Sequence, residues 1–199
     1  MRLKELIPFM KAYVYMRQQC DDDYQKTKKY LADNYNQNTA LFQQVLDKAK
    51  QKNESDIEKA MELAMKKVDE AFSDVNQAMD DCVVAPMSQE QHTILGVLDK
   101  LKDASISDEE AELYYRQLKT NYSAKRIGYP MLTKVTGRPQ VFVSYDIVKD
   151  TVDQIEKKTR NWVENYNPIS YDHFEFLETF EQALLDADAE VEAFLKGDA

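Results

Sequence analysis

Residues that break helices are scarce in this chain, and this scarcity constrains the fold more than any other feature of the sequence. The 199 residues include four glycines and five prolines, so few positions favour a turn. Hydrophobic residues make up 43% of the chain and charged residues 31%, as in ordinary globular domains. This composition excludes collagen-like, low-complexity and disulfide-scaffold proteins. We therefore expect a mainly α protein, an elongated helical bundle with long coiled-coil-like helices.

Apolar side chains recur at helical spacing in the N-terminal part of the chain. A first stripe covers residues 3–33, and its regular part should start near Pro8, because proline is tolerated in the first turn of a helix but not in its interior. The polar, asparagine-rich segment 33–38 should end this helix, and Thr39 can cap a shorter one. The pattern predicts two helices joined by a short polar turn.

Three sequences that begin with serine match the capping box, in which a serine and a Glu or Gln three residues later satisfy backbone N–H groups. They begin at Ser55, Ser88 and Ser107, and each predicts a helix start. The helix expected after Ser55 carries an apolar seam that could pack against a second long helix or a second copy of the chain, and Pro86 should end it. The seam residues are Ile57, Met61, Ala64, Val68, Phe72, Val75, Met79 and Cys82.

Residues 127–143 interrupt the helical pattern. They hold two glycines and two prolines, with valines and threonines around a Thr-Gly-Arg-Pro sequence, so we expect a small β-hairpin or an ordered loop. An antiparallel helical hairpin should follow over residues 146–199, with Ser170 capping its second helix. The chain then divides into an N-terminal helical region (1–112), a basic, tyrosine-rich helix end with the hairpin or loop (113–145) and the C-terminal hairpin, all within one domain if they pack together.

The N-terminal sequence lacks the features of an export signal or a membrane anchor. Charged residues interrupt every apolar run, and the longest apolar stretches are far shorter than the roughly 18 residues that a membrane span needs. Cys20 and Cys82 belong to no paired motif, as expected for two reduced thiols. We expect a cytoplasmic protein that does not bind a membrane.

Charge is distributed unevenly along the chain. The net charge is −10, yet residues 113–145 contain six basic residues and no acidic residue, whereas both flanking regions carry an excess of acid. The same segment holds five of the twelve tyrosines. Arginine and tyrosine are enriched at the energetic centres of protein interfaces, and basic and aromatic side chains together also contact phosphates and bases. The basic residues are Arg116, Lys119, Lys125, Arg126, Lys134 and Arg138.

Three interpretations of this basic segment are open. It can pack against acidic helices of its own chain, bind an unknown protein partner or a second copy, or bind nucleic acid, although the acidic flanks argue against nucleic acid. We predict a non-catalytic protein-protein interaction, adaptor or assembly module, in which arginine supplies forked hydrogen-bond donors and tyrosine a rigid anchor. The partner-binding residues would be Arg126, Tyr129, Lys134 and Arg138.

A second hypothesis assigns the function to the acidic helices. Carboxylates spaced along the last helix could imitate the phosphates of a nucleic acid and occupy a basic groove of a partner, as acidic inhibitors of the phage or mobile-element type do. The alternative, which assigns no specific function to these carboxylates, is a solvated helix face that keeps the protein in solution. The carboxylates concerned are Glu175, Glu178, Glu181, Asp186, Asp188, Glu190 and Glu192.

Motifs for catalysis, nucleotide binding or metal binding are missing from the sequence. Neither His92 nor His173 belongs to a metal-binding motif, and no glycine-rich phosphate loop occurs. Acidic residues on the two C-terminal helices could chelate Mg²⁺, but interleaved lysines favour solvated helix faces. We therefore expect no cofactor, no metal site and no enzymatic activity, and no motif identifies a family. The acidic residues considered are Asp146, Asp150, Asp153, Glu175 and Glu178.

Overall fold

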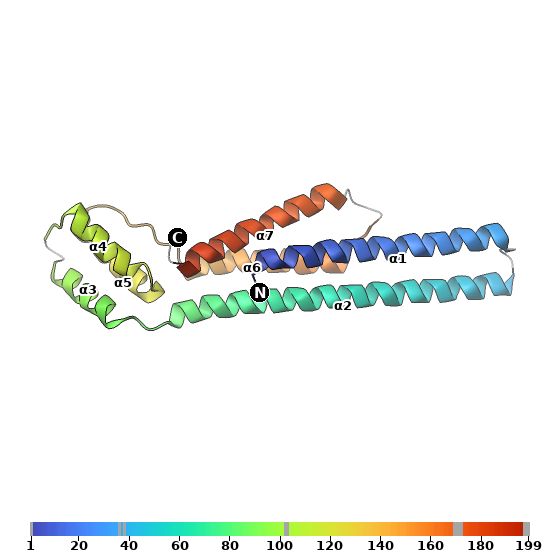
Figure 1. The fold of residues 1–199 in the computed structure, drawn as a ribbon, viewed down its shortest axis with the longest axis horizontal. Helices are drawn as coiled ribbons and strands as arrows, with labels where there is room; N and C mark the ends of the chain where they lie inside the picture. Colours follow the sequence, from blue (N-terminus) through green and yellow to red (C-terminus); the bar gives the residue numbers. More distant parts are fainter. Residues whose placement is uncertain (1, 36, 38, 102–103, 169–172, 197–199) are drawn as a thin grey trace. The chain divides into compact units, whose positions relative to one another are not determined.

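The computed structural model describes residues 2–35, 37, 39–101, 104–168 and 173–196. Within these ranges the chain is almost entirely helical and contains no strand (Figure 1), so the expectation of a mainly α fold is confirmed. A 3₁₀ turn, η1 (Leu3–Leu6), precedes the first α-helix. The α-helices are α1 (Ile7–Asn34), α2 (Ala40–Val84), α3 (Gln89–Lys100), α4 (Asp108–Leu118), α5 (Tyr122–Thr136), α6 (Tyr145–Asn165) and α7 (His173–Lys196).

The chain folds into two compact units. Unit 1 comprises Met1–Phe72 and Ile155–Leu185, and unit 2 comprises Ser73–Gln154 and Asp186–Ala199. Helices α2, α6 and α7 contribute residues to both units. These units differ from the three ranges into which the sequence divides, because segments far apart in the sequence pack together in each unit.

The first helix begins and ends where the sequence predicts. Pro8 occupies the first turn of α1, where its missing N–H is not needed, and α1 ends at Asn34 inside the asparagine-rich segment. The Thr39 hydroxyl accepts a hydrogen bond from the backbone N–H of Phe42 at 3.2 Å, so Thr39 caps the next helix.

The helix start predicted at Ser55 is wrong, because α2 runs from Ala40 to Val84 without interruption and passes through this serine. The residues immediately before Ser55 include lysine and glutamine, which are good helix formers, and neither glycine nor proline occurs within α2. A capping sequence starts a helix only where the preceding backbone leaves the helical conformation. The predicted end before Pro86 is confirmed.

An aromatic cluster formed by α1, α6 and α7 lies in the core of unit 1. The rings of Tyr13 and Trp162 meet edge to face with their centres 5.9 Å apart, and Trp162 stacks on Phe180 at 5.2 Å. The Tyr13 hydroxyl donates a hydrogen bond to the Val163 carbonyl at 2.7 Å and accepts one from Arg17 at the same distance. The three aromatic side chains are buried, so they hold the three helices together through both packing and hydrogen bonding.

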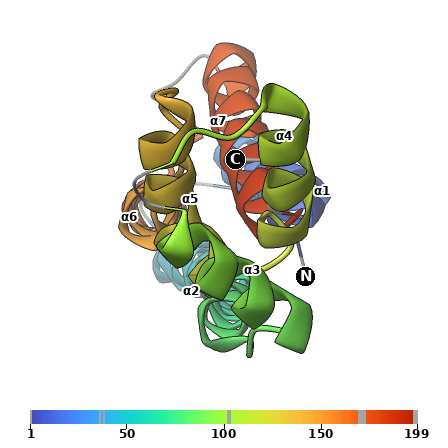
Figure 2. The same cartoon turned by 90° about the vertical axis from the view of Figure 1, so that its left-hand side faces the viewer.

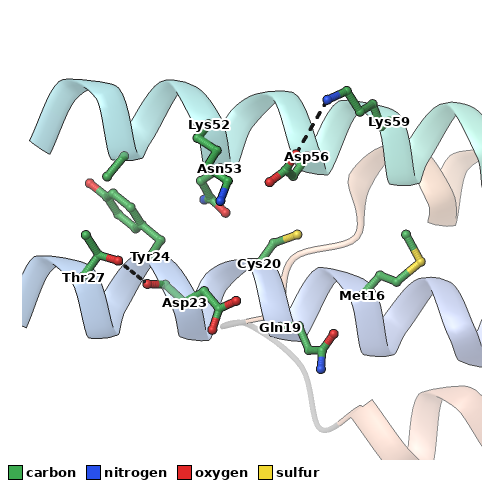
Figure 3. Close-up of a pocket in the computed structure, with 11 residues that line it drawn as sticks. Met16, Gln19, Cys20, Asp23, Tyr24, Thr27, Lys52, Asn53, Asp56 and Lys59 are labelled. Carbon is green, nitrogen blue, oxygen red and sulfur yellow. Dashed lines mark hydrogen bonds and ion pairs between the residues drawn. The ribbon is translucent and has the colours of Figure 1, made fainter. Parts of the chain in front are cut away.

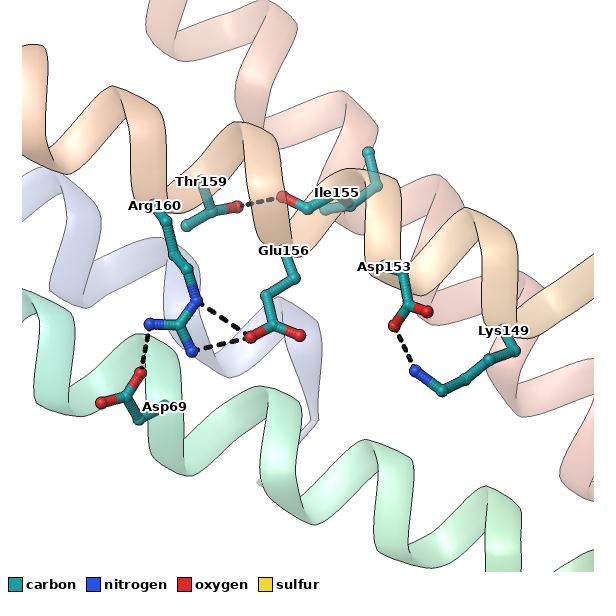
Figure 4. Close-up of polar contacts among 7 residues, drawn as sticks. All are labelled: Asp69, Lys149, Asp153, Ile155, Glu156, Thr159 and Arg160. Atoms are coloured by element: carbon teal, nitrogen blue, oxygen red, sulfur yellow. Dashed lines mark hydrogen bonds and ion pairs between the residues drawn. The ribbon is translucent and has the colours of Figure 1, made fainter.

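Ion pairs at the surface add to this packing (Figure 4). In unit 1 the guanidinium of Arg160 lies 2.6 Å from the Asp69 carboxylate and 2.7 Å from that of Glu156. The hydrogen bond to Glu156 and the proximity of Asp69 raise the pKa of Arg160. In unit 2, Lys149 and Asp153 form an ion pair within α6. Exposed pairs of this kind contribute about 0–1 kcal/mol each, so buried packing dominates the stability.

Helices α3, α4 and α5 pack together in unit 2, and α3 and α4 both contact α5 (Figure 2). The capping box at Ser88 is confirmed: its hydroxyl accepts the Gln91 N–H at 3.1 Å, and the Gln91 side chain accepts the Ser88 N–H at 2.9 Å. Ser107 caps α4 by accepting the Glu110 N–H at 3.2 Å. The buried residues that these helices share are Ile94, Leu98, Leu118, Ala124, Tyr129, Leu132 and Val135.

The β-hairpin predicted over residues 127–143 is not formed. Residues 127–136 are the C-terminal part of α5, and the helix ends at Gly137. The backbone of Gly137 has a φ angle of 68°, in the left-handed region that glycine adopts at helix ends. The alternative expectation, a loop, holds for residues 138–144.

The spacing of buried residues explains why this segment is helical. Gly128, Leu132 and Val135 lie at steps of four and three and are all buried, which is the period of one helix face. In the sequence this period is hidden, because one of the buried positions is a glycine and therefore resembles a break. Contacts across the core of unit 2 outweigh the β propensity of the valine.

Helices α6 and α7 run antiparallel. In unit 2 the start of α6 contacts the end of α7, where the rings of Tyr145 and Phe194 are 6.3 Å apart. In unit 1 the end of α6 contacts α7 through Trp162 and Phe180. The cap predicted at Ser170 lies outside the described residues. Among the helices of the described ranges, none combines the length and the apolar character needed to cross a membrane.

Candidate partner-binding surface

Helix α5 carries most of the residues for which the sequence predicts partner binding, and caps fix both of its ends. At its start the Asn121 side chain accepts the Ala124 N–H at 3.0 Å and donates to the Ala85 carbonyl, also at 3.0 Å. At its end the N–H of Gly137 bonds to the Thr133 carbonyl at 2.9 Å. The cap at Asn121 also ties α5 to the segment that precedes α3, so the helix cannot easily rotate.

Tyr129 lies in the core of unit 2 and not at its surface. Its side chain is 1% exposed. The ring stacks on Tyr115 with centres 5.2 Å apart and meets the edge of Phe142 at 6.3 Å. A buried ring cannot reach a partner, so the role of surface anchor predicted for Tyr129 is wrong. Its ring instead packs α5 against Tyr115 of α4.

Arg126 and Lys134 lie on the opposite, outer face of α5. Both side chains are exposed, and within the described part of the chain neither takes part in an ion pair. Pro130 is exposed between them, one turn from each. The neighbouring Ile127 side chain is 44% exposed. This outer face of α5 therefore combines two positive charges with apolar surface.

Other basic residues of the segment are engaged within unit 2. The guanidinium of Arg138 lies 3.0 Å from the Asp108 carboxylate, although both side chains are about two-thirds exposed. Arg116 pairs with Glu112 on α4 at 2.9 Å. Lys125 is 2% exposed. The charge anomaly of the sequence is thus partly neutralised by acids of α4, and Arg126 and Lys134 remain available at the surface.

A groove with a volume of about 400 Å³ lies beside Arg138. Two carboxylates and Arg138 line it together with aromatic and aliphatic side chains, which contribute apolar surface. Val141, on the loop after α5, is 76% exposed. The lining residues are Asp108, Ala111, Glu112, Tyr115, Leu132, Thr136, Arg138, Pro139, Gln140 and Val141.

The two cysteines, Cys20 and Cys82, carry thiols whose surroundings favour the protonated form. Burial raises the pKa of both thiols; Asp56 raises that of Cys20 further, whereas Lys125 opposes the rise at Cys82. Thiols with a raised pKa stay protonated at neutral pH and are weak nucleophiles. Among the described residues, no group of three or more His, Cys, Asp and Glu side chains is arranged to hold a metal ion.

Sequence reasoning left open whether acidic helices of the same chain pair with the basic segment, without naming the partners, and it missed the exposed apolar side chains beside the segment. The first turn of α4 contains Asp108, Glu109 and Glu110 and directly precedes the basic segment in sequence, and this block of acid was the available signal. Ile127 and Val141 gave no signal, because the exposure of Ile127 depends on which face of α5 packs inward and that of Val141 on the path of the loop after α5.

The chain matches no protein-family model, no curated protein and no solved structure. Only the geometry of this surface therefore points to a function.

Proposed function

We propose that the chain is a non-catalytic protein-interaction module that binds an acidic partner protein through the outer face of α5. The observation that carries this proposal is the pair Arg126 and Lys134, both exposed and outside any ion pair of the described residues. The chain has a net charge of −10, so most of its surface repels an acidic partner. Two such cations on one helix face attract a negatively charged partner instead.

The spacing of the two cations defines the chemistry of the partner. Lys134 lies eight positions after Arg126, which corresponds to about 12 Å along the helix axis. A partner helix with two carboxylates a similar distance apart fits this spacing. Arg126 can hold a carboxylate with two parallel hydrogen bonds, and Ile127 supplies an apolar contact between charged groups.

Arg138 extends this surface at the end of α5. Its ion pair with Asp108 is exposed on both sides and should contribute no more than about 1 kcal/mol. A carboxylate of the partner can therefore replace Asp108 at little cost, while apolar side chains of the same peptide enter the groove beside it. Tyr129 supports this region from the core through its stacking on Tyr115.

Site-specific photocrosslinking tests the proposal. A photoreactive amino acid at Ile127 should crosslink to a discrete partner in the native host, whereas the same probe at the exposed Lys158 of α6 should not. The double variant R126E/K134E should abolish the crosslink at residue 127 and leave the circular dichroism spectrum unchanged.

The matched control is K157E/K158E, which makes the same change of charge on another exposed helix face. It should leave the crosslink at residue 127 intact. Equal loss of crosslinking in both double variants would mean that overall charge, and not this face, controls binding. A crosslink that survives R126E/K134E would remove the outer face of α5 from consideration.

The two other hypotheses stay predictions, and the same geometry favours them less. A ladder of phosphate-like carboxylates on α7 is irregular, since Asp188 is 7% exposed and Glu181 pairs with Lys11 at 2.6 Å. For nucleic acid, burial of Lys125 and the pairing of Arg138 leave fewer cations to contact phosphates. Direct binding of an oligonucleotide that weakens steeply as salt rises would favour the nucleic-acid hypothesis instead.

A further inference from the structure

Helices α1 and α2 line an open cavity of about 410 Å³ in unit 1 (Figure 3). The side chains of Cys20 and Asn53 approach it from opposite helices, and Met16 lies at one end. Small and polar residues occupy this stretch of the interface, so the two helices do not fill the space between them. Asn53 also has a buried side-chain oxygen with no hydrogen-bond partner within the described residues.

Four large apolar side chains lie on the same face as the cavity. Heptad spacing places them, because residues seven apart share a helix face. Met16 lines the cavity, and Tyr30 follows the lining residue Asp23 by seven positions. Val45 precedes the lining residue Lys52 by seven, and Leu63 follows the lining residue Asp56 by seven. The four side chains are between 36% and 61% exposed, so the face carries unpartnered apolar surface around a central gap.

The positions of these side chains are self-complementary. Met16 and Tyr30 lie seven residues on either side of Asp23 on α1, and Val45 and Leu63 lie nine residues on either side of residue 54 on α2. Figure 3 shows Asp23 and Asn53 on facing stretches of the two helices, so the two positions are level with each other. If two copies meet face to face and antiparallel about a two-fold axis at this level, Met16 comes level with Tyr30 of the second copy, and Val45 with its Leu63.

One pair of opposite charges on this face obeys the same symmetry. Lys52 and Asp56 lie two residues on either side of residue 54, so each comes level with the other in an antiparallel pair. A parallel pair would instead bring together the two segments 24–52, each of which contains six lysines and two acidic residues.

We propose that this face of α1 and α2 binds a second copy of the chain in an antiparallel, two-fold symmetric pair. An isologous interface requires one patch to be complementary to itself. The apolar residues and the pair Lys52 and Asp56 meet this requirement at one register, whereas Asp23 faces its own copy at the axis. The proposal concerns unit 1 only and does not depend on the function proposed for α5.

Sedimentation analysis of the intact chain gives the first test. The chain should change from monomer to dimer as its concentration rises to about 100 μM, and the dimer should weaken between about 50 mM and about 500 mM salt because charge pairs set the register. A chain that stays monomeric at every concentration and salt overturns the proposal. A monomeric chain that binds an oligonucleotide or another protein at this face assigns the face to that ligand instead.

A charge-exchange experiment tests the register. K52E alone should raise the dimer dissociation constant by about tenfold, and D56K alone should do the same, because each brings like charges together at two symmetric contacts. The double variant K52E/D56K, and an equimolar mixture of the two single variants, should both recover dimerisation, since opposite charges again meet. Failure of both to recover it overturns the antiparallel register, and this recovery also excludes misfolding as the cause of the single-variant defects.

Disulfide trapping tests the orientation independently. In a background with C20S and C82S, a mixture of V45C and L63C chains should form crosslinked heterodimers when the thiols are oxidised with diamide. Neither variant alone should crosslink, because two copies of residue 45 would lie about 27 Å apart along the helices, beyond the reach of a disulfide. Efficient crosslinking of V45C with itself would overturn the arrangement.

Discussion

Replacing each of two helical glycines with alanine should change stability in opposite directions. Gly96 lies in α3 and Gly128 in α5. A Cβ atom added at Gly96 would meet nothing within 4 Å. A Cβ atom added at Gly128 would lie 2.5 Å from Cδ1 of Leu118 and 3.1 Å from Cδ2 of Leu95. The same substitution therefore tests helix propensity at one site and core packing at the other.

The magnitudes follow from these distances. Alanine is favoured over glycine inside a helix by about 1 kcal/mol, so G96A should raise the free energy of unfolding by about that amount. At Gly128 the same gain is opposed by overpacking, which costs about 1–3 kcal/mol in a filled core. Leu118 is fully buried and has little room to move away, so we expect G128A to lower the free energy of unfolding by about 1 kcal/mol.

Urea denaturation followed by far-ultraviolet circular dichroism measures both changes. The transition midpoint should rise for G96A and fall for G128A, with similar slopes. The additional substitution L118A removes the clashing atoms, so G128A should be better tolerated in that background than in the native chain. Equal stabilisation by G96A and G128A would refute the argument that Leu118 and Gly128 are in close contact.

Two further predictions concern the cap of α5 and the aromatic cluster of unit 1. N121A should lower the free energy of unfolding by about 2 kcal/mol, because it removes a helix cap and leaves the carbonyls of Ala85 and Pro86 without their donor. N121D should recover only the cap, because a carboxylate accepts the Ala124 N–H but donates nothing to the two carbonyls. Native-like stability of N121D in urea would contradict this. Burial raises the pKa of Tyr166 from 10.0 to about 12, so the unfolded chain releases this proton at lower pH than the folded chain, and stability should fall from pH 10 to 12. Between pH 8 and pH 11 the free energy of unfolding of the native chain should fall by about 1.4 kcal/mol more than that of Y166F. Parallel pH profiles of the two proteins would argue against a buried phenol.

The sequence predicts local structure best where the signal is itself local. Thr39, Ser88 and Ser107 cap helices as expected, because a cap involves a side chain and a backbone N–H only three residues away. The predicted start at Ser55 is wrong, because a capping sequence starts no helix when the residues before it are also helical. The mainly α class follows from the scarcity of glycine and proline.

The candidate surface was predictable only in part. The sequence identifies the basic segment and contains Arg126 and Lys134, which the fold leaves exposed. It also assigns Tyr129 to the surface, but this ring is buried against Tyr115. Whether a side chain on α5 faces the core or the solvent depends on where α3 and α4 pack, and no pattern within α5 contains that information.

Composition and spacing thus determined by themselves that the chain is helical, where most helices begin and end, and that positive charge gathers in one segment. Only the tertiary structure decided which of those charges are neutralised, as in the pair of Arg138 with Asp108, thirty residues away in the sequence. It also brought α1 and α2 together around an incompletely filled gap. The physical reason is that caps and helical periods act over a few residues, whereas burial and ion pairing depend on contacts between residues far apart along the chain.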